Sequence, residues 1–209
     1  MSRLIIFGDS YSNSWDNISK KHPSVLQNKY RVKFENENKR TPIHFSDIVN
    51  KSLGCGEIIN YSISGADNYT ILEQIGNKIH TINSNDFVIV GWSDITRYRH
   101  IENDKWMTNY VSDEILLEQG IQRNNSLIIS ELNSWQKILR KGIDNIFFWT
   151  PFYFSNIGNI PFVVNIKREE SGTIAEETDG KIDDLHWGET GHIIIGNYLI
   201  NKIKYNNLI

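Results

Sequence analysis

The sequence predicts an α/β protein in which a central parallel sheet is covered by helices on both faces, a three-layer α/β/α sandwich. Short apolar runs recur along the chain and alternate with amphipathic helical patterns. The runs are continuously apolar rather than alternating, as expected for strands that are buried on both faces. No internal repeat or linker divides the 209 residues. We therefore expect a single domain over residues 1–209.

Four apolar runs are predicted strands because each ends in a turn signal. Gly8 follows the first run and Gly91 the third, while Ser64-Gly65 follows the second and Pro151 the fourth. The predicted strands are residues 4–7, 57–61, 87–90 and 145–149.

Four helical patterns separate or follow these strands. Pro42 is expected to open the first, which Gly54 ends, and Asn68 to cap the second. The third has basic residues near its end and Gly142 just beyond, as helix C-termini often do. The apolar positions of the four are, in order, Phe45, Ile48, Val49 and Leu53; Ile71, Leu72, Ile75 and Ile79; Ile128, Leu132, Trp135 and Leu139; and Ile195, Leu199 and Ile203.

Three long segments with no clear pattern each follow the C-terminal end of a predicted strand: 11–41, 95–125 and 152–182. The connections that lead back into strands are short. Ligands of open parallel sheets bind at the C-terminal edge of the strands. We therefore expect these loops to surround an active site. For any single loop the alternative is a tolerated surface insertion.

Composition excludes several classes of function. The net charge of −3 provides no basic field for nucleic acid. The single cysteine, Cys55, cannot form an internal disulfide, and no Cys/His cluster has zinc spacing, so no metal site is predicted. No apolar stretch approaches the roughly 18 residues of a membrane span, and the apolar run near Met1 is too short for a signal peptide. We expect a cytoplasmic protein without a membrane span.

The first predicted strand ends in Gly8-Asp9-Ser10. A serine on a tight turn after a central strand presents its hydroxyl at the C-terminal edge of the sheet. Its backbone N–H is then free to point at a developing oxyanion. The same residues also suit an ordinary turn with a helix N-cap, so this motif alone is a weak signal.

Near the C-terminus, Asp183 precedes His186 by three residues. A carboxylate at this spacing can reach Nδ1–H of the imidazole, fix its tautomer and leave Nε2 facing a serine. His186 then serves as general base and later as general acid. The alternatives are a helix cap or surface turn, or Asp184 as the orienting acid. His192 has no carboxylate at the same offset and is interpreted as structural.

These two motifs resemble the first and last blocks of the SGNH (GDSL-like) hydrolase family of esterases and lipases. Ser64-Gly65 resembles the family's glycine block, whose backbone N–H is an oxyanion donor, and Gly91-Trp92-Ser93-Asp94 resembles its Gly-x-Asn-Asp block. The resemblance implies a flavodoxin-like SGNH hydrolase fold and no cofactor. It also implies a catalytic triad of Ser10, Asp183 and His186, and an oxyanion hole made by Ser10, Gly65 and Ser93.

Ser93 stands where the family has an asparagine whose side chain is an oxyanion donor. A serine hydroxyl is shorter and rotates freely. Losing a well-placed oxyanion donor typically costs about 100- to 1000-fold in rate. Three explanations stay open: Ser93 donates directly or through a water, another residue such as Asn68 supplies the donor, or the activity is slow or specialised.

Asp9, Trp92 and Arg97 are candidate substrate contacts. Arg97 opens a basic run that suits either an anion clamp or a solvated surface, and Trp92 either lines an acyl pocket or covers the sheet edge. By family analogy we expect hydrolysis of a small acyl ester, such as O-acetyl on a carbohydrate or a related short-chain ester. The alternatives are an O-acetyltransferase acting on a glycan, and a binding module on a catalytically retired fold, for which Ser93 is the best argument.

Overall fold

The computed structural model describes residues 1–15, 25–94, 97–102, 105–110, 125–151, 163–165 and 187–205. Within these ranges, five parallel strands form the central sheet in the order β2-β1-β3-β6-β7. Their bounds are β1 Arg3–Phe7, β2 Glu57–Asn60, β3 Phe87–Gly91, β6 Ile146–Thr150 and β7 Val163–Asn165. The four predicted strands are thus confirmed to within one residue at each end.

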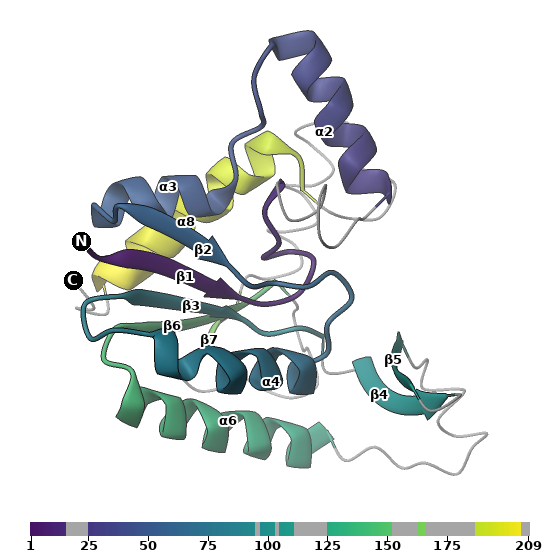
Figure 1. Cartoon of the computed structure of the whole chain (residues 1–209), viewed down its shortest axis with the longest axis vertical. Coiled ribbons are helices and arrows are strands. Elements are labelled where there is room, and N and C mark those ends of the chain that lie inside the picture. The colour runs from purple at the N-terminus through teal and green to yellow at the C-terminus, as the bar shows by residue number, and fades with distance from the viewer. Residues whose placement is uncertain are drawn as a thin grey trace.

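Helices cover both faces of the sheet, so the predicted three-layer architecture is confirmed (Figure 1). One face carries α3 (Phe45–Leu53) and α8 (Glu189–Tyr205), and the other carries α4 (Asn68–Lys78) and α6 (Asn125–Gly142). A short 3-10 turn, η1 (Ile79–Thr81), follows α4. None of the described helices is long and apolar enough to cross a membrane.

Each strand buries side chains on both faces, which explains the continuously apolar runs. Along β1, Ile5 and Phe7 belong to the cluster under α4 and α6, whereas Leu4 and Ile6 belong to the cluster under α3 and α8. All four are fully buried. Burying one such side chain stabilises the fold by about 1.5–3 kcal/mol. Two of the predicted apolar helix positions instead lie exposed: Trp135 on α6 and Ile79, which belongs to η1 rather than to α4.

The structure corrects both predicted helix starts. The helix α3 begins at Phe45 rather than at Pro42, and His44 caps it: its imidazole accepts from the Ser46 N–H, and the Asp47 carboxylate accepts from the His44 N–H. Gly54 ends α3 in the left-handed conformation (φ 66), as expected. Asp67, not Asn68, caps α4 and accepts from the Thr70 N–H. Asp67 and Asn68 both have side chains that can cap a helix, and only the fold decides which one does.

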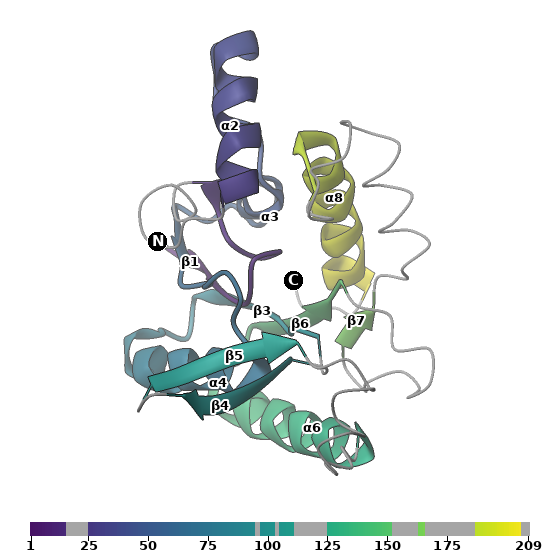
Figure 2. The same ribbon diagram turned by 90° about the vertical axis from the view of Figure 1, so that its right-hand side faces the viewer.

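Two of the three long segments contain regular elements that the sequence did not predict, and the third contains a short one. The helix α2 (Val25–Asn38) lies in 11–41, and the antiparallel hairpin of β4 (Arg97–Glu102) and β5 (Lys105–Tyr110) lies in 95–125. β7 lies in 152–182. Figures 1 and 2 show the hairpin apart from the sheet, on the side toward which the strands point. That these segments surround an active site within one domain stays a prediction.

Candidate active site

The carboxyl ends of β1, β2 and β3 bring together the first three predicted sequence blocks. The Ile63 N–H donates to the Gly8 carbonyl (3.0 Å), and the Asn13 amide donates to the Ser64 hydroxyl (3.0 Å). The Ser93 hydroxyl donates to Asp9 Oδ2 (3.1 Å). The serine, glycine and Gly-x-Asn-Asp-like blocks are therefore joined at one edge of the sheet.

Close packing of the ends of β1 and β3 determines the shape of the serine turn. The Ser12 side chain is fully buried between Gly8 and Gly91, and a Cβ on either glycine would overlap it. The turn closes through a hydrogen bond from the Ser12 N–H to the Asp9 carbonyl (3.1 Å), while the Asn60 side chain donates to the Ser12 carbonyl (2.7 Å). Glycine after both strands is thus required by this close approach.

Ser10 lies in this turn and is largely buried, with 5% of its area exposed. Its hydroxyl has no hydrogen-bond partner within the described part of the chain. Its carbonyl accepts from the Asn13 N–H (3.4 Å) and from Gln27 Nε2 of α2 (3.4 Å). Sequence reasoning missed Gln27 because it placed no helix in 11–41.

The backbone N–H groups of Ser10 and Gly65 are suited to stabilise an oxyanion. Gly65 is exposed and has φ 80, a conformation that glycine adopts without steric cost. Among the described residues, neither the Ser10 N–H nor the Gly65 N–H is donated to a protein acceptor. Unused N–H groups on adjacent turns are the kind of donor that stabilises developing negative charge on a carbonyl oxygen.

Asp9 of the serine turn and Arg97 form a buried ion pair. Asp9 Oδ2 accepts from Arg97 Nη1 (3.2 Å) as well as from Ser93, and Asp9 Oδ1 accepts from the Tyr11 N–H (3.0 Å). The side chains of Arg97 and Asp9 are 5% and 1% exposed. The prediction that Arg97 belongs to a solvated surface is therefore wrong, because its guanidinium is buried against Asp9.

The hydroxyl of Ser93 and the side chain of Asn68 are engaged with protein groups. The fully buried Ser93 hydroxyl donates to Asp9. The Asn68 amide donates to the Ser93 carbonyl (3.1 Å) and its oxygen accepts from the Ser93 N–H (2.8 Å). Asn68 therefore clamps the backbone of the third block. The single Ser93 proton points to Asp9 in this structure, and its role as an oxyanion donor stays a prediction.

Trp92 belongs to the core. Its side chain is 0% exposed and stacks on Phe148, with ring centroids 5.8 Å apart and an interplanar angle of 3°. This burial agrees with a packing role, and a contact of Trp92 with the acyl group stays a prediction.

Trp187 connects the start of α8 to the serine turn. Its buried ring lies edge-on to Tyr11, with centroids 5.1 Å apart, and also packs against Trp149 and His192. His192 is buried in the first turn of α8, in agreement with the structural role expected for it. Asp183, Asp184 and His186 lie outside the described residues.

His44 is a second buried histidine near this end of the sheet. Its ring lies 4.3 Å from that of His192 and 4.4 Å from that of Phe45, measured between centroids. Burial lowers the pKa of His44 from 6.5 to about 3, with a smaller opposing effect of the Asn13 backbone. The imidazole is therefore neutral at ordinary pH, and its position favours a structural role.

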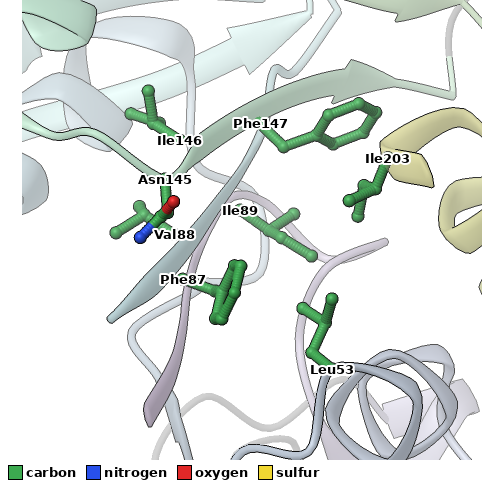
Figure 3. Close-up of a pocket in the computed structure, with 8 residues that line it drawn as sticks. All are labelled: Leu53, Phe87, Val88, Ile89, Asn145, Ile146, Phe147 and Ile203. Atoms are coloured by element: carbon green, nitrogen blue, oxygen red, sulfur yellow. The ribbon is translucent and has the colours of Figure 1, made fainter. Parts of the chain in front are cut away.

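A small apolar pocket lies at the opposite end of the sheet (Figure 3). Leu53 of α3 and Ile203 of α8 face the first residues of β3 and β6 across it, with Asn145 at its margin. It is separated from Ser10 by the length of the strands and contributes nothing to the site.

The described residues include no group of three or more side chains able to hold a metal ion.

No family model and no curated protein matches this sequence. Among solved structures, the chain is similar to a carbohydrate esterase whose active site is described as having divergent catalytic and non-catalytic binding functions. Identity is 13%, the TM-score is 0.47, and the match covers 97% of this chain and 68% of the esterase. It is also similar to phospholipase A1 from Streptomyces albidoflavus NA297, with 14% identity, a TM-score of 0.37, and 98% and 76% of the two chains covered. At these values the similarity assigns no family to the chain.

Proposed function

We propose that this protein hydrolyses small acyl esters, with Ser10 as nucleophile, His186 as general base and Asp183 as the acid that orients the base. The contact between the rings of Tyr11 and Trp187, 5.1 Å apart, carries the proposal. Tyr11 follows Ser10 directly and Trp187 follows His186 directly. Consecutive Cα atoms are about 3.8 Å apart. The contact thus ties the chain next to the proposed base to the chain next to the proposed nucleophile, although 176 positions separate the two in sequence.

The unused backbone donors support the same chemistry. Attack of Ser10 on an ester carbonyl produces a negatively charged oxygen that needs hydrogen-bond donors. The N–H groups of Ser10 and Gly65 lie on turns that hydrogen bonds hold together, and neither has a protein acceptor among the described residues. These two backbone groups are the proposed main donors, and Ser93, which stands in place of an asparagine, is the proposed third.

The proposed reaction has two steps. His186 accepts the Ser10 proton as the hydroxyl attacks the carbonyl, and the same proton then passes to the departing alkoxide, which leaves an acyl-enzyme and an alcohol. Water, activated by His186, hydrolyses the acyl-enzyme to the free acid and restores Ser10. Asp183 stabilises the imidazolium formed in each step. No step needs a cofactor.

A small acyl group is the substrate that we propose. Ser10 is only 5% exposed, and the side chains of Ser12, Trp92 and Ser93 beside and beneath its turn are fully buried. Such a nucleophile is accessible to acetyl or another short acyl chain more easily than to a bulky one. An O-acetylated carbohydrate is the proposed natural substrate class, as the resemblance to SGNH hydrolases implies.

The decisive experiment follows p-nitrophenyl acetate hydrolysis by the wild type, Ser10→Ala and His186→Ala. Removing either a nucleophile or its base typically costs at least about 1000-fold in kcat. Ser52→Ala is the matched serine control, because Ser52 is exposed on α3 and touches neither turn of the site. His80→Ala is the histidine control, because His80 is exposed on η1. Both controls are expected to keep the rate within about threefold of wild type.

A wild-type rate equal to that of Ser10→Ala, on acetyl and on longer acyl esters, would overturn the proposal and favour a binding role. If the ester is consumed in the presence of a glycan without matching release of free acid, the acyl acceptor is the glycan and the protein is a transferase.

A further inference from the structure

Arg97 makes contacts on two of the turns that form the candidate site. Its Nη1 donates to Asp9 Oδ2 (3.2 Å), one residue before Ser10, and to the Ala66 carbonyl (3.1 Å), one residue after Gly65. Arg97 itself follows the third block and is the first residue of β4. A single guanidinium nitrogen thus joins the serine turn to the glycine turn.

Burial makes these contacts costly to break. The Arg97 and Asp9 side chains are 5% and 1% exposed, so water does not replace the hydrogen bonds when they break. A buried carboxylate without its cation is strongly unfavourable, and the turn must rearrange to solvate it. Asp9 also accepts from the Tyr11 N–H, so movement of its carboxylate transmits to the backbone on both sides of Ser10.

We propose that Arg97 is a positioning residue for the proposed hydrolysis: through Asp9 and Ala66 it holds the Ser10 and Gly65 turns so that their N–H groups converge on one oxygen. This inference rests on the proposed function. Oxyanion donors act only when their geometry is set before the reaction, and a misplacement of about 1 Å costs about 100-fold in rate. Arg97 supplies this geometry from its buried position without contact to the substrate.

The test compares Arg97→Gln with Arg97→Lys. Glutamine removes the charge, whereas lysine keeps it on a nitrogen that has enough protons for both Asp9 and Ala66. Arg97→Gln is expected to lower kcat for p-nitrophenyl acetate about 100-fold with KM changed less than about threefold, and Arg97→Lys to recover at least about tenfold of that loss. The double variant Asp9→Asn/Arg97→Gln removes both buried charges. It provides a folded comparison if Arg97→Gln alone does not fold.

Arg3→Gln is the matched control. Arg3 pairs with the buried Asp86, and this pair also joins β1 to β3, but at the opposite end of the strands. Its loss removes a similar ion pair without touching either turn of the site. We expect Arg3→Gln to lower the thermal unfolding temperature while leaving kcat within about threefold of wild type.

Amide hydrogen exchange tests the positioning role of Arg97 independently of the proposed ester hydrolysis. Arg97→Gln is expected to speed exchange by about tenfold in residues 8–13 and 62–68, and Arg3→Gln to leave both segments unchanged. Unchanged exchange in Arg97→Gln overturns the positioning role. If the wild type hydrolyses the ester, the positioning role is also overturned when kcat falls no further in Arg97→Gln than in Arg3→Gln. If the wild type hydrolyses no ester, the proposed function fails, and exchange alone still decides whether Arg97 holds the two turns.

Discussion

The buried imidazole of His44 predicts a loss of stability at mildly acidic pH. Burial lowers the pKa of His44 from 6.5 to about 3, while the unfolded chain keeps the ordinary value. Between these values the unfolded state binds a proton that the folded state excludes. The contribution of His44 to stability is therefore complete above pH 6.5 and is lost as the pH falls toward 3. Each pH unit in this window costs about 1.4 kcal/mol, which amounts to about 2 kcal/mol at about pH 5.

His44→Asn isolates this effect. Asparagine is a preferred N-cap and can accept from the Ser46 N–H, as His44 does, but it does not titrate. The free energy of unfolding would be measured by urea denaturation at about pH 7 and about pH 5 for both proteins. The wild type should lose about 2 kcal/mol more than His44→Asn between the two.

Two other titratable groups face His44: His192 of α8 and the Asp47 carboxylate of α3. Both are present in wild type and variant, so their contributions largely cancel in the comparison. Equal losses in the two proteins would show that His44 takes up its proton in the folded state and would refute the argument from burial.

Two further predictions concern stability and the contact that supports the function. Gly76 lies exposed within α4 with no atom within 4 Å of an added Cβ, so Gly76→Ala should stabilise the protein by about 0.5–1 kcal/mol in thermal unfolding. Trp187→Leu should destabilise the fold by about 2–4 kcal/mol and also lower kcat, because it removes the contact with Tyr11. Trp149→Leu is the control, because Trp149 belongs to the same core cluster, and it should destabilise the fold similarly but retain most of kcat. Equal losses of kcat in the two variants would count against the proposed role of the Tyr11 contact.

The strands and most helices were predictable because their signals are local. Continuous apolar runs identified the strands to within one residue, and Gly54 marked the end of α3. Ser10 and Gly65 could be proposed as site residues for the same reason, since each stands in a short motif after such a run. The helix α2 was missed because it lacks a clear apolar stripe and carries polar side chains such as Arg31 and Glu35, which pair on its surface.

The roles of the polar side chains in the site were not predictable in this way. Arg97 was a candidate surface or substrate residue, and Asp9 a candidate substrate contact, yet they form a buried pair across 88 positions of sequence. Ser93 donates to the same carboxylate across 84 positions. No local pattern encodes such a pairing, because it depends on where the strands place the ends of separate loops.

Local signals predicted the α/β/α architecture and placed the candidate residues after the strands, because hydrophobic periodicity and turn residues act over a few neighbouring positions. The tertiary structure was needed to show that Trp92 lies in the core, that Arg97 pairs with Asp9 of the serine turn, and that Tyr11 contacts Trp187. Burial and pairing of these side chains arise from contacts between distant segments, and such contacts form only once the sheet has assembled.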